Sequence, residues 1–324
     1  MEGSAADALT LGRGNHTYRW IDHWAELPDT PSVRENGRTH GVAVSKTGHV
    51  YVFCQADPAV LIFNQEGEQI GAWGDRFPGA HGLTLVEQGD EEYLWLTDEH
   101  TGEVVRTTLD GRTVQNLQRP DHPAYRAGGS YSPTWVAENE ERFGGNGDIW
   151  VADGYGASLI HRYDRAGAYR GTLTGEEGDA GAFDCPHGIA FDFRRGEGEL
   201  YVADRGNRQV QVFGGDGRFR RTLGRGVLHS PCMFSFHGEE VLIPELHASV
   251  VVLDGKDERV VRLGDNEDST RRHDTWPDHH VAGRPELIQP GLFNSPHAAT
   301  ADAEGNLYVV EWLIGGRITK LARQ

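Results

Sequence analysis

The chain has 324 residues, and its 31 basic and 49 acidic side chains give a formal net charge of −18. A charge of this sign argues against nucleic acid and anionic membrane as partners, and no apolar run approaches the roughly 18 residues that span a bilayer. Glycine is abundant (43) and methionine rare (2), a balance that favours turns and strands over packed helices.

The N-terminal segment predicts a cytoplasmic setting. It has no apolar stretch of the kind found in a secretory signal, so we expect a protein that is not exported. The three cysteines, Cys54, Cys185 and Cys232, are an odd number and do not make a disulfide framework. We expect all three to be free thiols in a reducing compartment.

Six segments then repeat one pattern in chain order. Each has a short apolar strand, a turn with acid or glycine, a second apolar strand ending near Asp or Glu, and a third strand. The segments begin at His40, His81, Pro133, Pro186, Pro231 and Pro296. Repeats of this length with alternating polarity are typical of propeller blades, which bury their faces by stacking around a channel.

Three further segments complete the prediction of one propeller domain over residues 18–324. Residues 1–17 are expected to be a flexible N-terminus. The strand-like stretch from Tyr18 to Pro28 has no blade of its own, so we expect it to close the sixth blade as its outer strand. Residues 263–294 form a long insertion. Its members Arg271, Arg272, His273, Trp276, His279 and His280 are expected in either a substrate-contacting lid or a solvated loop. A parallel α/β fold is the weaker alternative, because no amphipathic helical pattern separates the strands.

The repeat also aligns residues capable of metal chemistry. The position at the start of each inner strand is occupied, blade by blade, by His40, His81, Thr134, His187, Cys232 and His297. Blades 2, 4 and 6 alternate around a sixfold ring, so their histidines should converge about 120° apart. Three imidazoles with one open position are typical of catalytic zinc, and the absence of carboxylates at this position disfavours calcium and magnesium.

A structural interpretation of the same pattern stays open. His-Gly could be a repeat consensus in which the ring caps a turn in every blade. Cys232 could also approach the metal from its ring position, as could Cys185 from its place two residues before His187, although a small buried cysteine is the commoner role.

The sequence resembles the peptidyl-α-hydroxyglycine α-amidating lyases, zinc-dependent six-bladed propellers of the wider NHL-repeat group. The resemblance is carried by VADGYG, PHGIAFD, VADRGN, HGLTL and SPHAATADAEGNLYVVE, and it spans roughly residues 40–324. It implies His81, His187 and His297 as zinc ligands, Tyr155 as the catalytic tyrosine and Arg205 as a substrate-binding arginine.

The departures from that pattern concern the substrate. The family's second arginine falls at Gln55, so half of a carboxylate clamp is missing. The family's structural calcium uses a carboxylate where this chain has Ala298, with carbonyls matching Val42 and Leu83, so we do not expect that ion. His40 replaces a small residue and is expected to add a nitrogen near the metal. We therefore assign Gln55, Arg205 and His40 to substrate binding, with a small-molecule or peptide-derived substrate other than peptidylglycine.

The chemistry of such a lyase can be stated from the residues. Collapse of a carbinolamide into an amide and an aldehyde needs a Lewis acid for the hydroxyl and a base for its proton. Tyr155 is the candidate base, because a nearby dication favours the phenolate, and Arg205 is the candidate clamp for an anion or carbonyl. Two alternatives remain: a metal-dependent hydrolase or lactonase, and a non-catalytic NHL-type interaction module.

Overall fold

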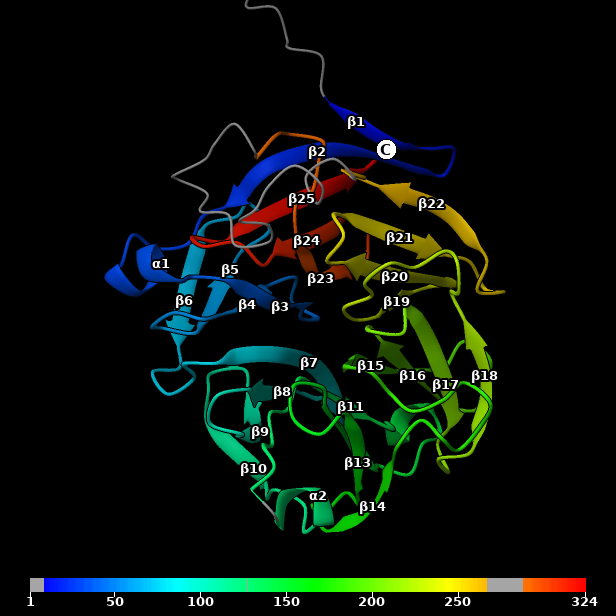
Figure 1. Ribbon diagram of the computed structural model, residues 1–324. Coiled ribbons are helices and arrows are strands. Elements are labelled where there is room, and N and C mark those ends of the chain that lie inside the picture. The colour runs from blue at the N-terminus through cyan, green and yellow to red at the C-terminus, as the bar shows by residue number, and fades with distance from the viewer. Residues whose placement is uncertain (1–8, 127, 267–287) are drawn as a thin grey trace, which may run out of the picture.

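The computed structural model describes residues 9–126, 128–266 and 288–324, and in these residues six antiparallel sheets surround a common centre (Figure 1). The innermost strand of each sheet lies toward that centre, and consecutive sheets follow one another around the ring. The predicted six-bladed all-β propeller is therefore confirmed.

The blades follow the chain in order. Blade 1 consists of β3 (Thr39–Val44), β4 (Val50–Cys54), β5 (Val60–Phe63) and β6 (Gln69–Trp73). Blade 2 consists of β7 (Ala80–Gln88), β8 (Glu91–Asp98), β9 (Val104–Thr108) and β10 (Thr113–Leu117). Blade 3 consists of β11 (Trp135–Glu138), β12 (Ile149–Asp153), β13 (Leu159–Tyr163) and β14 (Tyr169–Leu173).

The second half of the ring repeats this order. Blade 4 consists of β15 (Pro186–Asp192), β16 (Glu199–Asp204), β17 (Gln209–Gly214) and β18 (Phe219–Leu223). Blade 5 consists of β19 (Ser235–His237), β20 (Glu240–Glu245), β21 (Ser249–Leu253) and β22 (Arg259–Leu263). Blade 6 consists of β23 (Pro296–Ala301), β24 (Leu307–Glu311), β25 (Arg317–Arg323), β2 (His16–Ala25) and β1 (Thr10–Arg13). Short helical turns are α1 (Pro31–Glu35), α2 (Pro123–Arg126) and η1 (Glu141–Phe143).

The N-terminal strand closes the ring, as the sequence predicts. Strand β2 pairs antiparallel with the last strand, β25, with Trp20 opposite Leu321. Regular structure begins, however, before the predicted boundary at residue 18. Strand β1 pairs with β2, so residues predicted to be flexible add a fifth strand to blade 6. This pairing covers the edge that β2 would otherwise leave open.

The core is built from strands buried on both faces. In β21 all five residues of SVVVL are buried, because the sheet is packed between blades 4 and 6. The outer strands are more polar and more exposed, as in β6 and β18. Branched apolar side chains suit the middle strands of a blade, where the pleated surface is covered from both sides.

A carboxylate at the end of the second strand holds each of five blades together. Asp98 accepts the backbone N–H of Gly79, and Asp153 accepts that of Ser132. Asp204, Glu245 and Glu311 accept equivalent amides in blades 4, 5 and 6. Each accepted amide lies two or three residues before the residue at the ring position, so the repeat acids fix the approach to the channel.

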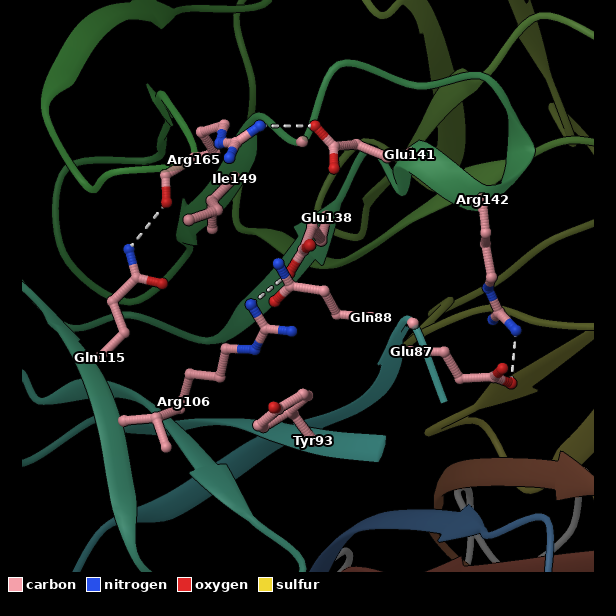
Figure 2. Close-up of a pocket in the computed structure, with 13 residues that line it drawn as sticks. Glu87, Gln88, Tyr93, Arg106, Gln115, Glu138, Glu141, Arg142, Ile149 and Arg165 are labelled. Carbon is pink, nitrogen blue, oxygen red and sulfur yellow. Dashed lines mark hydrogen bonds and ion pairs between the residues drawn. The ribbon is translucent and has the colours of Figure 1, made fainter. Parts of the chain in front are cut away.

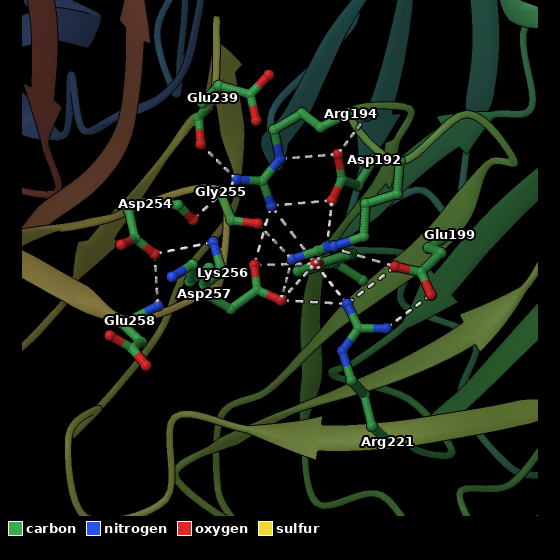
Figure 3. A network of polar contacts seen from close by, with 12 residues as sticks. Asp192, Arg194, Glu199, Arg221, Glu239, Asp254, Gly255, Lys256, Asp257 and Glu258 are labelled. Carbon is green, nitrogen blue, oxygen red and sulfur yellow. Dashed lines mark hydrogen bonds and ion pairs between the residues drawn. The ribbon is translucent and has the colours of Figure 1, made fainter.

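A second polar cluster ties blade 4 to blade 5 (Figure 3). Asp257, in the turn between β21 and β22, accepts from Arg194, Arg195 and Arg221 of blade 4 at 2.8–3.1 Å. The hydroxyl of Tyr201 lies 3.0 Å from the same carboxylate. All of these charges have partners, so the cluster is a structural tie.

Most of the predicted insertion lies outside the described residues, including Arg271, Arg272, His273, Trp276, His279 and His280. Within the described part of the chain, no helix has the length and apolar character required to cross a bilayer.

Candidate metal centre

Three histidines converge at the centre of the ring, as the alternate-blade pattern predicts. The ring centroids of His81, His187 and His297 are 4.7, 4.8 and 4.9 Å apart, a nearly equilateral triangle. All three side chains are buried, with at most 1% of any residue exposed. They come from the first residues of β7, β15 and β23.

Local irregularities in these strands turn the histidines inward. The pairing of each inner strand with its neighbour shifts register at the histidine, between Ala80 and Leu83, between Pro186 and Ile189, and between Pro296 and Ala298. A bulge re-aims one side chain away from the regular alternation. The same shift occurs at His40, between Thr39 and Gly41.

The glycine that follows the histidine is required for packing between neighbouring blades. A Cβ at Gly82 would lie 2.4 Å from the carbonyl oxygen of Thr134, and one at Gly188 would lie 2.2 Å from that of Cys232. The inner strand of the next blade passes too close for a side chain. The His-Gly pair therefore combines two roles: the glycine permits close packing, and the histidine is free to project into the channel.

Each of the three imidazoles is oriented by the next blade. Nδ1 of His81 lies 2.8 Å from the carbonyl oxygen of Thr134, Nδ1 of His187 lies 2.8 Å from that of Cys232, and Nδ1 of His297 lies 2.8 Å from that of His40. A carbonyl can only accept, so Nδ1 carries the proton in each ring and Nε2 carries a lone pair. This outer hydrogen bond is the arrangement that fixes the tautomer of metal-ligating histidines.

These contacts argue against the interpretation of His-Gly as a turn cap. The histidine rings do not cap turns in their own blades, because their Nδ1 atoms donate across to the neighbouring blade. The environment also keeps the rings neutral. Burial holds the pKa of His81 and His187 well below the ordinary value and lowers that of His297 to about 3, with Arg205 acting in the same direction. Neutral imidazole is the form that binds metal.

Trp135 closes the channel beneath the triad. Its ring centroid lies 6.1, 6.4 and 6.3 Å from those of His81, His187 and His297, so the indole is close to the axis of the triangle. Only 2% of Trp135 is exposed. The pattern of ring positions does not single out Trp135. The repeat does contain a signal for it, because Trp135 occupies the position where blades 1, 2 and 4 have glycine.

Tyr155 projects from the turn after β12 toward the same histidines and is partly exposed to solvent. Its hydroxyl lies 3.3 Å from Nε2 of His81 and 3.0 Å from Nε2 of His187, and 37% of the residue is exposed. Desolvation raises the pKa of Tyr155 above its usual value, and the positive charge of Arg205 opposes that shift. The protein alone therefore favours the phenol form.

Arg205 lies directly against Tyr155. Its Nη2 donates to the phenol oxygen at 3.3 Å and to Sγ of Cys185 at 3.2 Å. The guanidinium carbon is 5.3 Å from the centre of the tyrosine ring. The carboxylates of Asp153 and Asp204 bind amides, from the turn that follows each of them and from the segment that leads into the inner strand of their blade.

The ring residues of blades 1 and 5 flank the triad. His40 lies beside His81 and His297, with centroid distances of 4.7 and 4.5 Å. In the described residues, two groups of three side chains have ligand atoms all within 4.8 Å of one another: His40, His81 and His297, and His187, Cys232 and His297. The predicted ligands are divided between these groups, and His297 belongs to both.

Gln55 does not point a free amide toward the histidines. Its Oε1 accepts from Asn36 at 3.1 Å, and its Nε2 donates to Glu99 at 3.0 Å. Glu99, in the turn after β8, is a candidate that the sequence pattern does not single out. Burial raises the pKa of Glu99, and the charge of Arg205 acts against that rise, so the two groups share one environment.

A large cavity lies elsewhere in the described residues. It has a volume of about 620 Å³ between blades 2 and 3, and Glu87, Arg106 and Arg142 are among its lining (Figure 2). Strand β7 runs from His81 to Gln88 at this cavity, a distance of about 20 Å at the usual rise per residue. The cavity is therefore on the other face of the propeller from the triad.

The donor set fits a divalent metal of the zinc type. Three neutral imidazoles are held by outer hydrogen bonds, and Nε2 of His297 is buried with no hydrogen-bond partner in the described part of the chain. A buried nitrogen lone pair with no donor is energetically unfavourable, and a bound cation would satisfy it.

Comparison with known proteins agrees with the blade pattern. The NHL repeat family matches residues 183–213, which lie in blade 4 and include His187 and Arg205. Human NHL repeat-containing protein 3 is 32% identical over 210 residues, 61% of this chain and 57% of the human protein. A Caenorhabditis elegans protein named probable peptidyl-alpha-hydroxyglycine alpha-amidating lyase is 28% identical over 224 residues, 60% of this chain and 61% of the worm protein. The matches thus span a little over half the length of these relatives.

Solved structures support the fold. A streptogramin B lyase superposes with a TM-score of 0.61 at 12% identity, covering 97% of this chain and 98% of that one. Virginiamycin B lyase from Staphylococcus aureus gives a TM-score of 0.56 at 12% identity, covering 95% and 100%. At this identity the likeness shows the propeller fold alone.

Proposed function

We propose that this propeller, similar in sequence to NHL repeat proteins and to a probable amidating lyase, is a zinc-dependent lyase. It cleaves the N–C bond of a carbinolamide and releases an amide and an aldehyde. His81, His187 and His297 hold the ion, Tyr155 handles the proton and Arg205 binds the substrate. The proposed substrate is a small or peptide-derived molecule other than peptidyl-α-hydroxyglycine.

One observation carries the proposal. The two histidines nearest Tyr155 have their Nδ1 protons committed to backbone carbonyls, and their Nε2 lone pairs face its hydroxyl. Arg205 donates to the same hydroxyl. A metal-binding face, a proton-transfer group and an anion-binding group thus meet at one atom, which an interaction surface does not require.

The reaction converts R–C(=O)–NH–CH(OH)–R′ into R–C(=O)–NH₂ and O=CH–R′. The hydroxyl O–H bond and the C–N bond break, a C=O bond forms, and the proton ends on the amide nitrogen. A bound zinc ion would supply the Lewis acidity that lowers the pKa of the substrate hydroxyl. Tyr155 Oη, as phenolate, takes the hydroxyl proton and returns it to the departing nitrogen.

The remaining residues position the substrate and exclude water. Arg205 stabilises the phenolate through its existing contact, and its planar guanidinium is the group that binds a substrate anion or carbonyl. The buried indole of Trp135, near the axis of the triad, keeps water away from that side of the histidines. Next to Gln55, the half-buried carboxyl of Glu99 places an acidic group where the family has a second arginine. A second substrate carboxylate there would meet repulsion, which supports a substrate shifted away from peptidylglycine.

The test combines metal content with turnover. Protein expressed with ample zinc is expected to carry one ion per chain and to release aldehyde from a small synthetic α-hydroxy amide. Replacing any one of His81, His187 and His297 by alanine is expected to lower both, while His49→Ala, a histidine in a blade 1 turn, changes neither. Circular dichroism checks that the strands are retained.

The alternatives give different results. A zinc-free protein without aldehyde release would favour an NHL-type interaction module. Stoichiometric zinc with hydrolysis of lactones, and no cleavage of α-hydroxy amides, would favour a metal-dependent hydrolase.

A further inference from the structure

We infer that His40 is a fourth imidazole ligand of the proposed metal centre, binding at the edge of the triad that lies away from Tyr155. This inference rests on the proposed function, because it concerns the same ion. It adds a ligand that the three-histidine pattern does not contain, and it gives His40 a metal-binding role in place of the substrate-binding role expected from the sequence.

The first observation is that the ring of His40 is buried and has no hydrogen-bond partner in the parts of the chain that the structure describes. The residue is 2% exposed, and neither Nδ1 nor Nε2 contacts a donor or acceptor among the described residues. The three other histidines of the centre each have a carbonyl partner for Nδ1. A buried imidazole with both nitrogens unsatisfied is unfavourable in a folded protein, and its retention calls for a partner that is bound to the site.

The second observation is its position. Ligand atoms of His40, His81 and His297 all lie within 4.8 Å of one another, so these three side chains form a group that could hold one ion. The backbone carbonyl of His40 also accepts from Nδ1 of His297. His40 thus adjoins the centre through both its main chain and its ring.

The third observation is that His40 is presented in the same way as the other histidines. Strand β3 shifts register at His40, as β7, β15 and β23 do at theirs. Gly41 follows it, and a Cβ there would lie 2.5 Å from Cβ of Leu83. Blade 1 therefore repeats the bulge and the close packing that turn a histidine toward the channel.

The flanking groups occupy different edges of the triangle. Tyr155 contacts His81 and His187, His40 adjoins His81 and His297, and Cys232 is grouped with His187 and His297. The thiol of Cys232 has an acceptor, the carbonyl of Ser230 at 3.6 Å, whereas the ring of His40 has none among the described residues. A fourth ligand at the His40 edge leaves the Tyr155 edge for substrate, since zinc can expand to five ligands.

The experiment counts imidazoles. Pulsed electron paramagnetic resonance of the copper(II)-loaded protein detects the remote nitrogen of each coordinated imidazole. Four are expected in the wild type and three in His40→Leu, with His100→Ala, an exposed histidine after β8, unchanged from the wild type. Zinc affinity, measured by competition with a chelator, is expected to fall at least about tenfold in His40→Leu, since even loss of an outer partner costs 10- to 100-fold.

The unfolding temperature of the metal-free protein distinguishes a metal ligand from a side chain that only packs. Because leucine has a similar volume and no polar atoms, metal-free His40→Leu is expected to unfold at the same temperature as the wild type or higher. Should this variant not fold, His40→Gln takes its place.

Three imidazoles in the wild type, with zinc affinity unchanged in His40→Leu, would overturn the inference and leave the proposed function intact. A lower unfolding temperature of metal-free His40→Leu would assign the side chain to packing and also overturn it. A wild type that binds neither copper nor zinc would refute the proposed function itself.

Discussion

Nε2 of His187 lies 3.0 Å from the phenol oxygen of Tyr155, while Nδ1 of the same ring is held by the carbonyl of Cys232. Because Nδ1 carries the ring proton, the phenol must donate to Nε2. The lone pair that a metal would use is therefore the one that holds the Tyr155 proton in the metal-free protein. Metal binding and retention of that proton compete for one atom.

This relationship predicts that Tyr155→Phe separates metal binding from turnover. Zinc affinity is expected to stay the same or rise, because the Nε2 lone pairs of His81 and His187 lose a competing donor. The kcat for aldehyde release is expected to fall about 10²- to 10⁴-fold, the usual contribution of a general acid–base group. Chelator competition and steady-state kinetics measure the two effects. Unchanged kcat would exclude Tyr155 as the base.

The contact between Gln55 and Glu99 predicts what happens when the family's second arginine is introduced at position 55. In Gln55→Arg, the new guanidinium is expected to pair with the Glu99 carboxylate, which accepts from Gln55 at 3.0 Å. The single variant should gain little with a carboxylate-bearing α-hydroxyglycine peptide. Gln55→Arg combined with Glu99→Gln should raise kcat/KM for that peptide by about 10- to 100-fold, the equivalent of one charge-assisted hydrogen bond.

The comparison substrate is a small α-hydroxy amide without a carboxylate, for which neither variant should improve kcat/KM. If the wild type already prefers the peptide and the double variant shows no gain in kcat/KM, the proposed shift in substrate is wrong.

Close packing at the ring predicts a large effect of one methyl group. A Cβ in Gly188→Ala would lie 2.2 Å from the carbonyl oxygen of Cys232, the same atom that orients His187. We expect a loss of about 1–3 kcal/mol in the free energy of unfolding, together with weaker zinc binding. Gly171→Ala, in outer strand β14 with open space around the Cβ, is the matched control. Equal urea midpoints for the two variants would contradict the close approach.

The buried His161 predicts acid sensitivity that does not involve the metal. Its Nε2 donates to the hydroxyl of Tyr125, which donates to Asp153, and burial lowers the pKa of His161 to about 3. Between about pH 3 and 6.5 the unfolded chain binds a proton that the folded protein does not, so stability falls as pH falls. From pH 7 to 4.5 this group is expected to remove about 2–3 kcal/mol.

Urea unfolding of the wild type and His161→Gln at both pH values measures this contribution. The variant should lose less stability on acidification than the wild type. Equal losses would show that His161 is not held neutral by the fold.

The sequence by itself determined the repeat, the number of blades and the residues at each ring position. These features are local: alternating strands, turn glycines and the acids that bind nearby amides are encoded within about 40 residues of one blade. The blade starts are 41 to 65 residues apart, but each blade repeats the same ring position. That repetition was also enough to predict that His81, His187 and His297 would meet, and that the N-terminal strand would pair with the last one.

Only the tertiary structure decided how the centre is oriented. The hydrogen bonds that fix the three histidines join residues 53, 45 and 257 positions apart, each in a different blade from its partner. Trp135 beneath the triad, Glu99 beside Gln55 and the unsatisfied ring of His40 depend likewise on contacts between blades. A repeat specifies what each blade presents, but the partner of each group is set by the neighbouring blade that packs against it.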